Sequence, residues 1–351
     1  MADTLTGVGA DGRITLAHGG GGSAMRALID DVFLSVFAQS PALPQEDQAR
    51  LDLSALTRQG DRLAFTTDAF VVEPLEFPGG NIGTLAVCGT VNDLAVGGAT
   101  PVALSAAFVL AEGLELAVLR RVVAAMAHSA AQAGVRIVTG DTKVVPRHAC
   151  DGLFVTTSGV GVIRSGQNIS IAAGQPGDVV LVNGTLGDHG AAILCARGDL
   201  ALQTQLQSDC APLNSLVDTL LHAVPDVHCM RDATRGGVAG VLSELAEASG
   251  VLVSIHEAAL PVHPQVEGVC EILGLDPLFL ANEGKLVAVV PASRAEQALA
   301  AMQSHPLGRN AAIIGTLQAS PSGVGAVHIV NGFGGARVLT MPSGEQLPRI
   351  C

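Results

Sequence analysis

The chain has 351 residues, which at roughly 150 residues per domain suggests two domains. The 32 acidic side chains outnumber the 19 Lys and Arg, so the formal net charge is −13, and such a surface repels nucleic-acid phosphates and anionic lipid heads. Hydrophobic residues make up 48% and charged residues 15% of the chain, a globular rather than a disordered composition, and without Trp or Tyr it lacks the usual platform for base stacking. We therefore expect neither a nucleic acid nor a membrane as partner.

The first residues, MADTLTGVGADGR, contain acids and glycines in place of the basic cluster and apolar core of a secretory signal. The longest apolar stretch, residues 118–137, is interrupted by Arg120, Arg121, His128 and Arg136, so it does not qualify as a membrane span. The seven cysteines are widely spaced and form no CxxC pair. We expect a cytoplasmic protein in which most cysteines are thiols.

Short apolar runs alternate with longer periodic ones along the chain. In the first half the pattern predicts helices over residues 82–96 and 116–133, and strands over residues 63–72, 102–111, 135–139 and 153–163. The polar, glycine-rich segment 164–178 predicts a domain boundary. The second half is again mixed, with strands predicted over 179–182, 251–255, 285–290 and 311–317 and helices over 188–196, 212–223, 234–248 and 294–304. The predicted fold class is α+β, with two mixed α/β domains at 1–165 and 166–334.

The last stretch, residues 335–351, contains Gly335, Pro342, Gly344 and Pro348 among polar residues and has little that could pack. We predict a flexible C-terminal arm that ends in Cys351. At ~3.3 Å per residue the arm could extend ~50 Å, more than the radius of one domain. The terminal thiol could therefore reach a site elsewhere on the molecule.

A run of four glycines follows His18 and precedes Ser23. Such a run is useful where backbone amides must wrap closely around a ligand, and it is also typical of a loose linker. The GxGxxG match at residues 7–12 has no preceding strand, so it lacks the context of a dinucleotide site, and the chain contains no P-loop motif.

Four acidic residues stand in contexts that can be interpreted individually. Asp68 lies in a predicted strand, Asp93 in an apolar helix and Asp141 directly after a strand, whereas Asp47 lies in a charged stretch that could simply face solvent. Charges within apolar elements need partners, and Mg²⁺ held by carboxylates together with phosphates is a frequent one. Helix caps and ion pairs are the alternatives for each residue alone.

Two further motifs carry charge next to predicted elements. In RDATRGG (231–237), Asp232 or Thr234 could cap a helix whose glycines form an anion-binding start. In NEGK (282–285), an acid and an ammonium lie close together, which is typical of a turn and also of a tuned proton-transfer group. The internal cysteines are interpreted as small core residues, and Cys351 is the exception.

Taken together, segments along nearly the whole chain resemble the hydrogenase maturation factor HypE family, the carbamoyl dehydratases. The matching segments are HGGGGSAM at 18–25, FPGGNIGTLAVCGTVNDLAVGGATP at 77–101, VTGDTKVV at 138–145, GTLGDHGA at 184–191, RDATRGGV at 231–238, ANEGKL at 281–286, HPLG at 305–308 and PRIC at 348–351. The terminal PRIC distinguishes this family from its ATP-using relatives, which include selenophosphate synthetase, thiamine monophosphate kinase and aminoimidazole ribonucleotide synthetase.

The resemblance implies two domains of the aminoimidazole ribonucleotide synthetase-like type, with an N-terminal ATP-binding and dimerisation domain that pairs its sheet in a homodimer. It implies that the Cys351 thiol receives a carbamoyl group from the carbamoyltransferase HypF. ATP then phosphorylates the carbamoyl oxygen, and loss of phosphate leaves a thiocyanate. The cyanide passes to iron on the HypC–HypD scaffold complex and becomes a ligand of [NiFe]-hydrogenase.

By matching motif positions, the resemblance also assigns site residues. Cys351, Glu283 and Lys143 are the expected catalytic residues, with Glu283 as the base for the amide protons. The expected ATP-binding residues are His18, Gly19, Gly20, Gly21, Gly22, Asp68, Asn92, Asp93, Asp141 and Asp232. The expected Mg²⁺ ligands are Asp47, Asp68, Asp93 and Asp232.

A kinase or ligase of the same superfamily that acts on a free small molecule is the alternative. For such an enzyme Cys351 would be dispensable. A passive carrier of the carbamoyl or cyanide group is disfavoured by the acidic residues.

Overall fold

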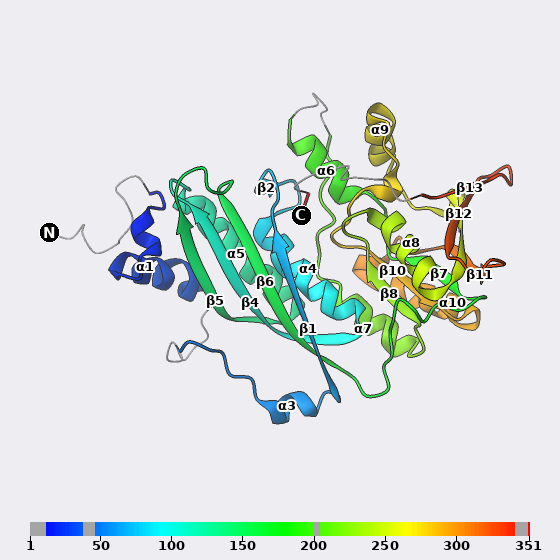
Figure 1. The fold of residues 1–351 in the computed structure, drawn as a ribbon, viewed down its shortest axis with the longest axis horizontal. Coiled ribbons are helices and arrows are strands. Elements are labelled where there is room, and N and C mark those ends of the chain that lie inside the picture. Colours follow the sequence, from blue (N-terminus) through cyan, green and yellow to red (C-terminus); the bar gives the residue numbers. More distant parts are fainter. Residues whose placement is uncertain (1–11, 38–45, 199–203, 341–349) are drawn as a thin grey trace.

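Two β-sheets organise the structure, one in each half of the chain, and they lie side by side in Figure 1. The structure is a computed structural model that describes residues 12–37, 46–198, 204–340 and 350–351. Within these ranges no helix has both the length and the hydropathy that a membrane span requires.

The N-terminal sheet has four strands in the order β1-β6-β4-β5, and only the β4–β5 pair is parallel. Helix α4 lies on one face of this sheet and helix α5 packs against α4, whereas the other face is turned towards the viewer in Figure 1. The bounds are β1 Arg62–Phe70, α4 Ile82–Val96, β4 Ala99–Ala111, α5 Leu116–Ala133, β5 Arg136–Val145 and β6 Leu153–Ile163.

Helix α4 is apolar and buried nearly all round, as expected for a helix enclosed by a sheet, a second helix and another domain. Its N-cap Asn81 accepts hydrogen bonds from the amides of Gly83 and Thr84. Helix α5 is amphipathic and ends at Gly134, whose φ of +68° is the left-handed C-cap conformation that glycine adopts at little cost. Local sequence thus explains where α4 begins and where α5 ends.

Smaller elements precede and flank this sheet. A helical segment runs through η1, α1, the π-helical turn η2 and α2, and it packs against β5 and α5. The bounds are η1 Leu16–Gly19, α1 Ser23–Leu28, η2 Ile29–Leu34, α2 Ser35–Phe37, α3 Leu53–Thr57, β2 Glu76–Phe77 and β3 Gly80–Asn81.

The C-terminal sheet has seven strands in the order β13-β12-β9-β11-β7-β10-β8. One hydrophobic core lies between this sheet and α8, and another between the sheet, α7 and α10. The strands are β7 Val179–Val182, β8 Cys229–Asp232, β9 Val251–His256, β10 Leu286–Val290, β11 Ala312–Ala319, β12 Ala326–Val330 and β13 Ala336–Val338. The helices are α6 Asp188–Ala196, α7 Asn214–Ala223, α8 Gly237–Ser249, η3 Glu257–Ala259, α9 Pro264–Leu273, η4 Pro277–Phe279, η5 Ala292–Arg294, α10 Ala295–Ser304 and η6 Pro306–Gly308.

The two halves share buried surface. Ala95 and Val96 at the end of α4 belong to the hydrophobic core that α7 and α10 build. Ala281 and Ile350, which are far along the chain, belong to the core of the N-terminal sheet. Helix α4 therefore lies at the junction, and residues near it can meet groups from both halves.

Several expectations need correction. Strand β5 extends to Val145, so Asp141 lies within a strand and not after one. Neither Asp232 nor Thr234 caps α8, because Asp232 ends β8 and the N-cap is Gly236. Strand β13 pairs with β12 at residues that were expected to begin the arm. The remainder of that predicted arm, residues 341–349, lies outside the described residues.

Candidate active site

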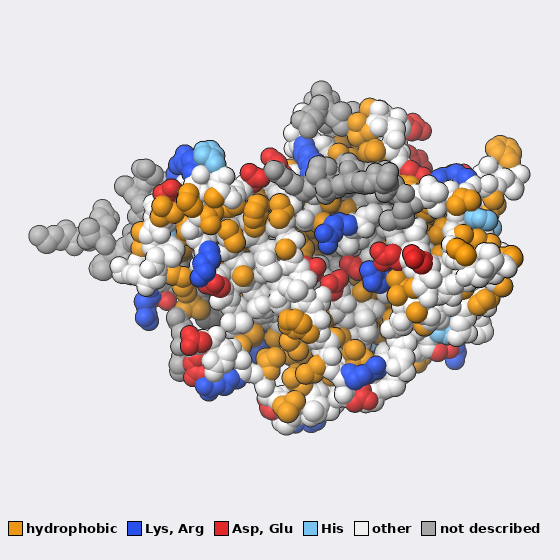
Figure 2. All heavy atoms as spheres, in the orientation of Figure 1, with side chains coloured by type: hydrophobic (Ala, Val, Ile, Leu, Met, Phe, Trp, Pro, Cys, Tyr) orange, Lys and Arg blue, Asp and Glu red, His pale blue; other side chains and the backbone are white. Residues whose placement is uncertain are grey.

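A small pocket of about 40 Å³ opens where β1, α4 and the C-terminal half meet. A water needs roughly 10–15 Å³ of such space, so the pocket alone holds a few waters or an ion. Figure 2 shows acidic side chains gathered near the middle of the face, where the two halves adjoin. The pocket is lined by Asp68, Ala69, Phe70, Gly89, Asp93, Asp232, Thr234, Arg235, Glu283 and Cys351.

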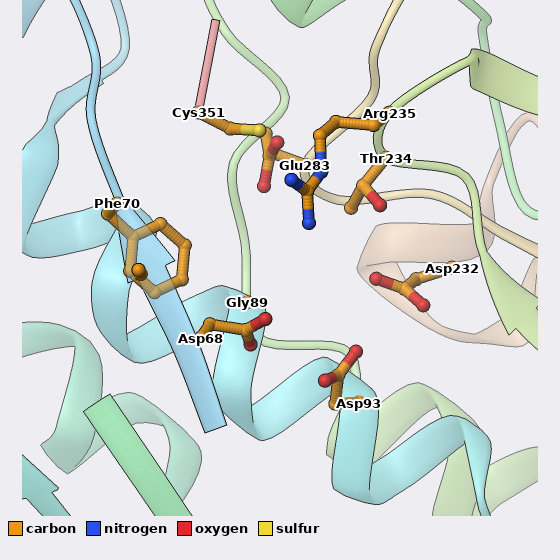
Figure 3. Close-up of a pocket in the computed structure, with 10 residues that line it drawn as sticks. Asp68, Phe70, Gly89, Asp93, Asp232, Thr234, Arg235, Glu283 and Cys351 are labelled. Carbon is orange, nitrogen blue, oxygen red and sulfur yellow. The ribbon is translucent and has the colours of Figure 1, made fainter. Parts of the chain in front are cut away.

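Three aspartates from three elements point into this space (Figure 3). Asp68 comes from β1, Asp93 from α4 and Asp232 from the end of β8. Burial, together with repulsion from Asp93, raises the pKa of Asp68 to about 6, and the same two causes raise the pKa of Asp232 to about 7. The fold thus holds carboxylates together at an electrostatic cost.

Such a set fits a divalent cation bound together with phosphates. No group of three or more His, Cys, Asp or Glu in the described chain is close enough to enclose a metal without other ligands. Mg²⁺ typically takes one or two carboxylates and completes its shell with water and substrate phosphates. The mutual repulsion of Asp68, Asp93 and Asp232 is the observation that a positive ion would relieve.

Glu283 and Cys351 lie together at the other side of the pocket (Figure 3). Glu283 is 2% exposed, and its Oε1 atom has no hydrogen-bond partner among the described residues. Burial, then the nearby Asp209 and Asp232, raise the pKa of Glu283 well above the usual value. Burial, followed by the charge of Glu283, also raises the pKa of the Cys351 thiol. A carboxyl group that can take up a proton is thereby placed beside the terminal sulfur.

Arg235 is the cation that faces these acids. Its guanidinium group points into the pocket (Figure 3), and its charge partly opposes the rise that burial causes in the pKa of Asp68 and of Cys351. It lies between β8 and α8, within a motif that sequence reasoning noted but for which it named only Asp232 and Thr234. The signal that could have found it is the second arginine of RDATRGG.

The loop that carries Glu283 is held by Asp209. The Asp209 carboxylate accepts hydrogen bonds from the amides of Glu283 and Gly284, each at 3.1 Å, and from Lys285 Nζ at 2.8 Å. Burial alone would raise the pKa of Asp209, but Lys285 and these hydrogen bonds lower it. Sequence reasoning missed Asp209, because it lies about 75 residues from the loop in sequence and in no recognised motif.

Asn92 completes the support of this loop. Its side-chain amide donates to the carbonyl oxygens of Ala211 and Glu283, and its Oδ1 atom accepts from the amide of Leu213. Asn92 is 2% exposed and lies outside the pocket lining. Asn92, expected to bind ATP, thus contacts the loop that carries Glu283 in this structure.

The end of the chain is docked at the pocket. Ile350 is 5% exposed and its carbonyl oxygen accepts a hydrogen bond of 2.7 Å from His189 Nε2. The amide of Val71 donates to Cys351 O at 3.3 Å. All seven cysteines are free, so Cys351 is a thiol here.

The other predicted residues lie away from this pocket. Asp141 and Lys143 pair with Ala107 and Val109 on the open face of the sheet, the face opposite to Asp68, and form an ion pair at 3.1 Å. His18 is buried beside β5, where a Cβ atom on Gly19 would come within 3.0 Å of Val144. These residues form a second group at the β5 edge, and the glycine loop from Gly20 to Gly22 follows directly.

Asp47 belongs to neither group. It is exposed in the segment before α3 and does not line the pocket. The described chain therefore does not bring all the expected site residues to one pocket, because β5 and β1 are opposite edges of the sheet.

Comparison with known proteins gives a consistent result over the whole chain. The AIR synthase related protein N-terminal domain matches residues 45–163, and the corresponding C-terminal domain matches residues 175–328. Carbamoyl dehydratase HypE of Rhodobacter capsulatus is 60% identical over 97% of this chain and 99% of its own length. Carbamoyl dehydratase HypE of Escherichia coli is 53% identical over 96% of this chain and 99% of its own.

Solved structures agree. The crystal structure of the hydrogenase maturation protein HypE in complex with ATP has a TM-score of 0.90 and 46% identity, covering 96% of this chain and 99% of that one. The structure of a HypE–HypF complex contains a chain with a TM-score of 0.77 and 46% identity, covering 90% of this chain and 100% of that one. The chain belongs to the HypE carbamoyl dehydratase family, within the AIR synthase related proteins.

Proposed function

We propose that the protein is an ATP-dependent carbamoyl dehydratase that converts an S-carbamoyl group on its own Cys351 into a thiocyanate for [NiFe]-hydrogenase maturation. The observation that carries this proposal is the location of the last residue. Cys351 lines an acid-lined pocket beside a buried glutamate whose Oε1 atom is unpartnered among the described residues. The family membership and the ATP complex of a relative support the same activity.

The reaction removes water from a carbamoyl thioester. ATP supplies the phosphoryl group that turns the carbamoyl oxygen into a leaving group, so the oxygen departs in phosphate and both amide hydrogens depart as protons. Glu283 accepts an amide proton, since it lies beside the Cys351 sulfur and burial raises its pKa, which makes its ionised form a stronger base. Arg235 faces the negative charge that develops during the transfer.

Asp68, Asp93 and Asp232 would hold Mg²⁺ against the ATP phosphates. The cation would neutralise phosphate charge, and its presence would make the ionised aspartates favourable neighbours. The pocket of about 40 Å³ holds a few waters or an ion, so the nucleotide would lie largely outside it.

The carbamoyl group must be loaded outside this pocket. A thiol reacts as its thiolate, and the docked position raises the pKa of Cys351. We expect Cys351 to leave the pocket for loading by HypF, to return for dehydration, and to leave again for a HypC–HypD iron scaffold complex. A relative in complex with HypF supports the first partner, and the resemblance alone supports the second. The cytoplasmic location stays a prediction from sequence.

We propose that the active form is a homodimer that pairs the open faces of the N-terminal sheets. That face of β1 exposes Leu63 by 58% and Phe65 by 72%, and Figure 2 shows hydrophobic side chains among small and polar ones on it. At about 4.8 Å per strand, the β5 edge lies about 14 Å from β1 within one subunit. A facing sheet would bring the partner's β5 edge, with the second group of site residues, towards the pocket.

The experiment is a mass measurement on intact protein. After loading with a carbamoyl donor, ATP and Mg²⁺ should remove the mass of one water from the adduct, and proteolysis should map the product to Cys351. Cys351→Ala should abolish the adduct while ATP binding persists, and Cys150→Ala, at a residue that lines a different pocket, should behave as wild type. An adduct on the Cys351→Ala variant, or ATP turnover with a diffusible substrate, would instead favour the kinase or ligase alternative.

A further inference from the structure

We propose that His189 is the docking residue for the chain terminus, and that it positions Cys351 for dehydration by holding the carbonyl group of Ile350. This inference rests on the proposed function and deepens it. GTLGDHGA, the motif that contains His189, supplies no residue to the proposed reaction.

The hydrogen bonds of the His189 ring determine its tautomer. Nε2 lies 2.7 Å from the carbonyl oxygen of Ile350, which can only accept, so Nε2 carries a proton. Nδ1 lies 2.8 Å from Ser208 Oγ, and burial lowers the pKa of the ring, so the neutral ring accepts a hydrogen bond from the serine hydroxyl. Ser208 Oγ in turn accepts from the amide of Cys210 at 3.1 Å. The hydrogen bond from Ser208 to Nδ1 therefore fixes Nε2 as the ring nitrogen that donates to the Ile350 carbonyl oxygen.

The surroundings of the ring are also fixed. His189 is fully buried and lies in the first turn of α6, with the Phe77 ring edge-on at 5.5 Å between ring centroids. A buried imidazole with both nitrogens bonded has little freedom to turn. His189 is thus a rigid donor, 161 residues away in sequence from the carbonyl that it binds.

The contact lies one residue before the reacting sulfur. With Ile350 buried and Val71 holding Cys351 O, the His189 bond fixes the backbone on which the Cys351 side chain swings towards Glu283. A hydrogen bond between neutral groups is worth about ten-fold in an equilibrium, enough to favour docking and weak enough to let the tail leave. His189 is accordingly a positioning residue, and it touches no reacting atom.

The test compares two amides at this position. A glutamine side chain places its Nε2 close to where the histidine Nε2 lies, whereas the shorter asparagine does not reach the Ile350 carbonyl. In His189→Asn we expect iodoacetamide to alkylate Cys351 about ten-fold faster than in wild type, because the docked thiol is protonated and shielded. His189→Gln should stay within about three-fold of wild type. Cleavage after Glu345 yields residues 346–351 for mass analysis.

Two cysteines serve as internal controls. Cys88 is fully buried, so its alkylation would reveal a general loosening of the fold, and partly buried Cys150 should react equally in every variant. The second readout uses protein already carbamoylated. His189→Asn should convert it to thiocyanate about ten-fold more slowly than wild type with unchanged ATP affinity, and His189→Gln should recover most of the rate.

Equal alkylation of Cys351 in wild type, His189→Gln and His189→Asn would overturn the inference, as would equal conversion rates. The two proposals fail separately. If wild type forms no thiocyanate and yet the asparagine variant exposes Cys351, the dehydratase proposal is refuted and the docking role stands.

Discussion

The pocket aspartates lower the stability of the ligand-free protein while they supply the negative charge that a cation would bind. Asp68 and Asp232 have folded-state pKa values of about 6 and about 7, above their ordinary value of 3.8. A raised pKa means that the folded state binds protons more tightly than the unfolded chain. Without a cation, these residues therefore lower the free energy of unfolding as pH rises from about 4 to about 7.

From this we predict opposite pH trends for stability and for metal affinity. Mg²⁺·ATP should bind about ten-fold or more tightly at pH of about 8 than at about 5.5, because the cation needs ionised carboxylates. The free energy of unfolding without ligand should fall over the same range. Calorimetric titration and chemical denaturation at several pH values measure both.

Asp68→Asn is the matched variant for that experiment. It removes a charge that burial and Asp93 disfavour, so the ligand-free protein should gain of order 1 kcal/mol at pH above 7 after allowing for solvent screening, and lose affinity for Mg²⁺·ATP. A pH-independent affinity in wild type would contradict the assignment of these acids to the metal.

For Glu283→Gln we predict that dehydration of the carbamoylated protein slows by about a hundred-fold. Glutamine keeps the shape of the side chain but cannot accept the amide proton. Since Glu283 lies at the sulfur side of the pocket, ATP affinity should stay within about two-fold of wild type. Single-turnover rates and calorimetric titration separate the two effects, and an unchanged rate would rule out Glu283 as the base.

At the scale of elements, one buried ion pair holds the loop before β10 in place. Asp209 and Lys285 have side chains that are 4% and 11% exposed, and Asp188 lies 3.8 Å from the same ammonium. Taking away one partner of a buried pair leaves the other charge uncompensated, which typically costs about 3–5 kcal/mol.

We therefore predict that Asp209→Asn lowers the free energy of unfolding by about 3 kcal/mol and slows dehydration, because the Glu283 loop loses its anchor. Asp218→Asn is the control. Asp218 is half-exposed in its ion pair with Arg164, so its loss should cost less than about 1 kcal/mol. Urea denaturation of both variants measures the difference in the free energy of unfolding. Equally small losses in the two variants would show that the buried Asp209–Lys285 ion pair does not stabilise the loop.

Local patterns predicted the elements that sequence-local forces determine. Helices α4 and α5 have the predicted bounds, since the apolar run of α4, the apolar periodicity of α5 and the glycine at 134 are local features of the sequence. Strand β8 and helix α9 were not predicted, because a four-residue strand and a ten-residue helix carry short patterns.

Part of the site was predictable for the same reason. Asp68, Asp93, Asp232, Glu283 and Cys351 were all expected at the site, and the structure brings them to one pocket. Residues that act through tertiary contacts were missed: Asp209, His189 and Arg235. The sequence also could not predict that Lys143 lies away from the pocket, because the face of the sheet on which a residue lies depends on the register between neighbouring strands.

For the whole molecule, the separation between the pocket and the site residues at the β5 edge leads to a test of the proposed dimer. If the partner subunit's β5 edge completes each pocket, Lys143→Ala and Asp93→Ala should each be inactive alone. A mixture of the two variants should regain activity, because a mixed dimer contains one site with an intact Asp93 and an intact Lys143. Mixing after brief dissociation, followed by the mass measurement, tests this.

Phe65→Asp is the companion variant, and it should shift the protein towards monomer in sedimentation because it charges the exposed face of β1. An inactive mixture would place both residues in sites within one subunit, and a dimer unaffected by Phe65→Asp would place the interface elsewhere.

The docked terminus also limits how the gene product can be handled. Cys351 O accepts a hydrogen bond from the amide of Val71, and Cys351 lines a pocket of about 40 Å³, so we expect residues appended after it to disturb this docked arrangement. A purification tag fused after Cys351 would hold the sulfur out of reach of Glu283, whereas a tag at the other end leaves it free.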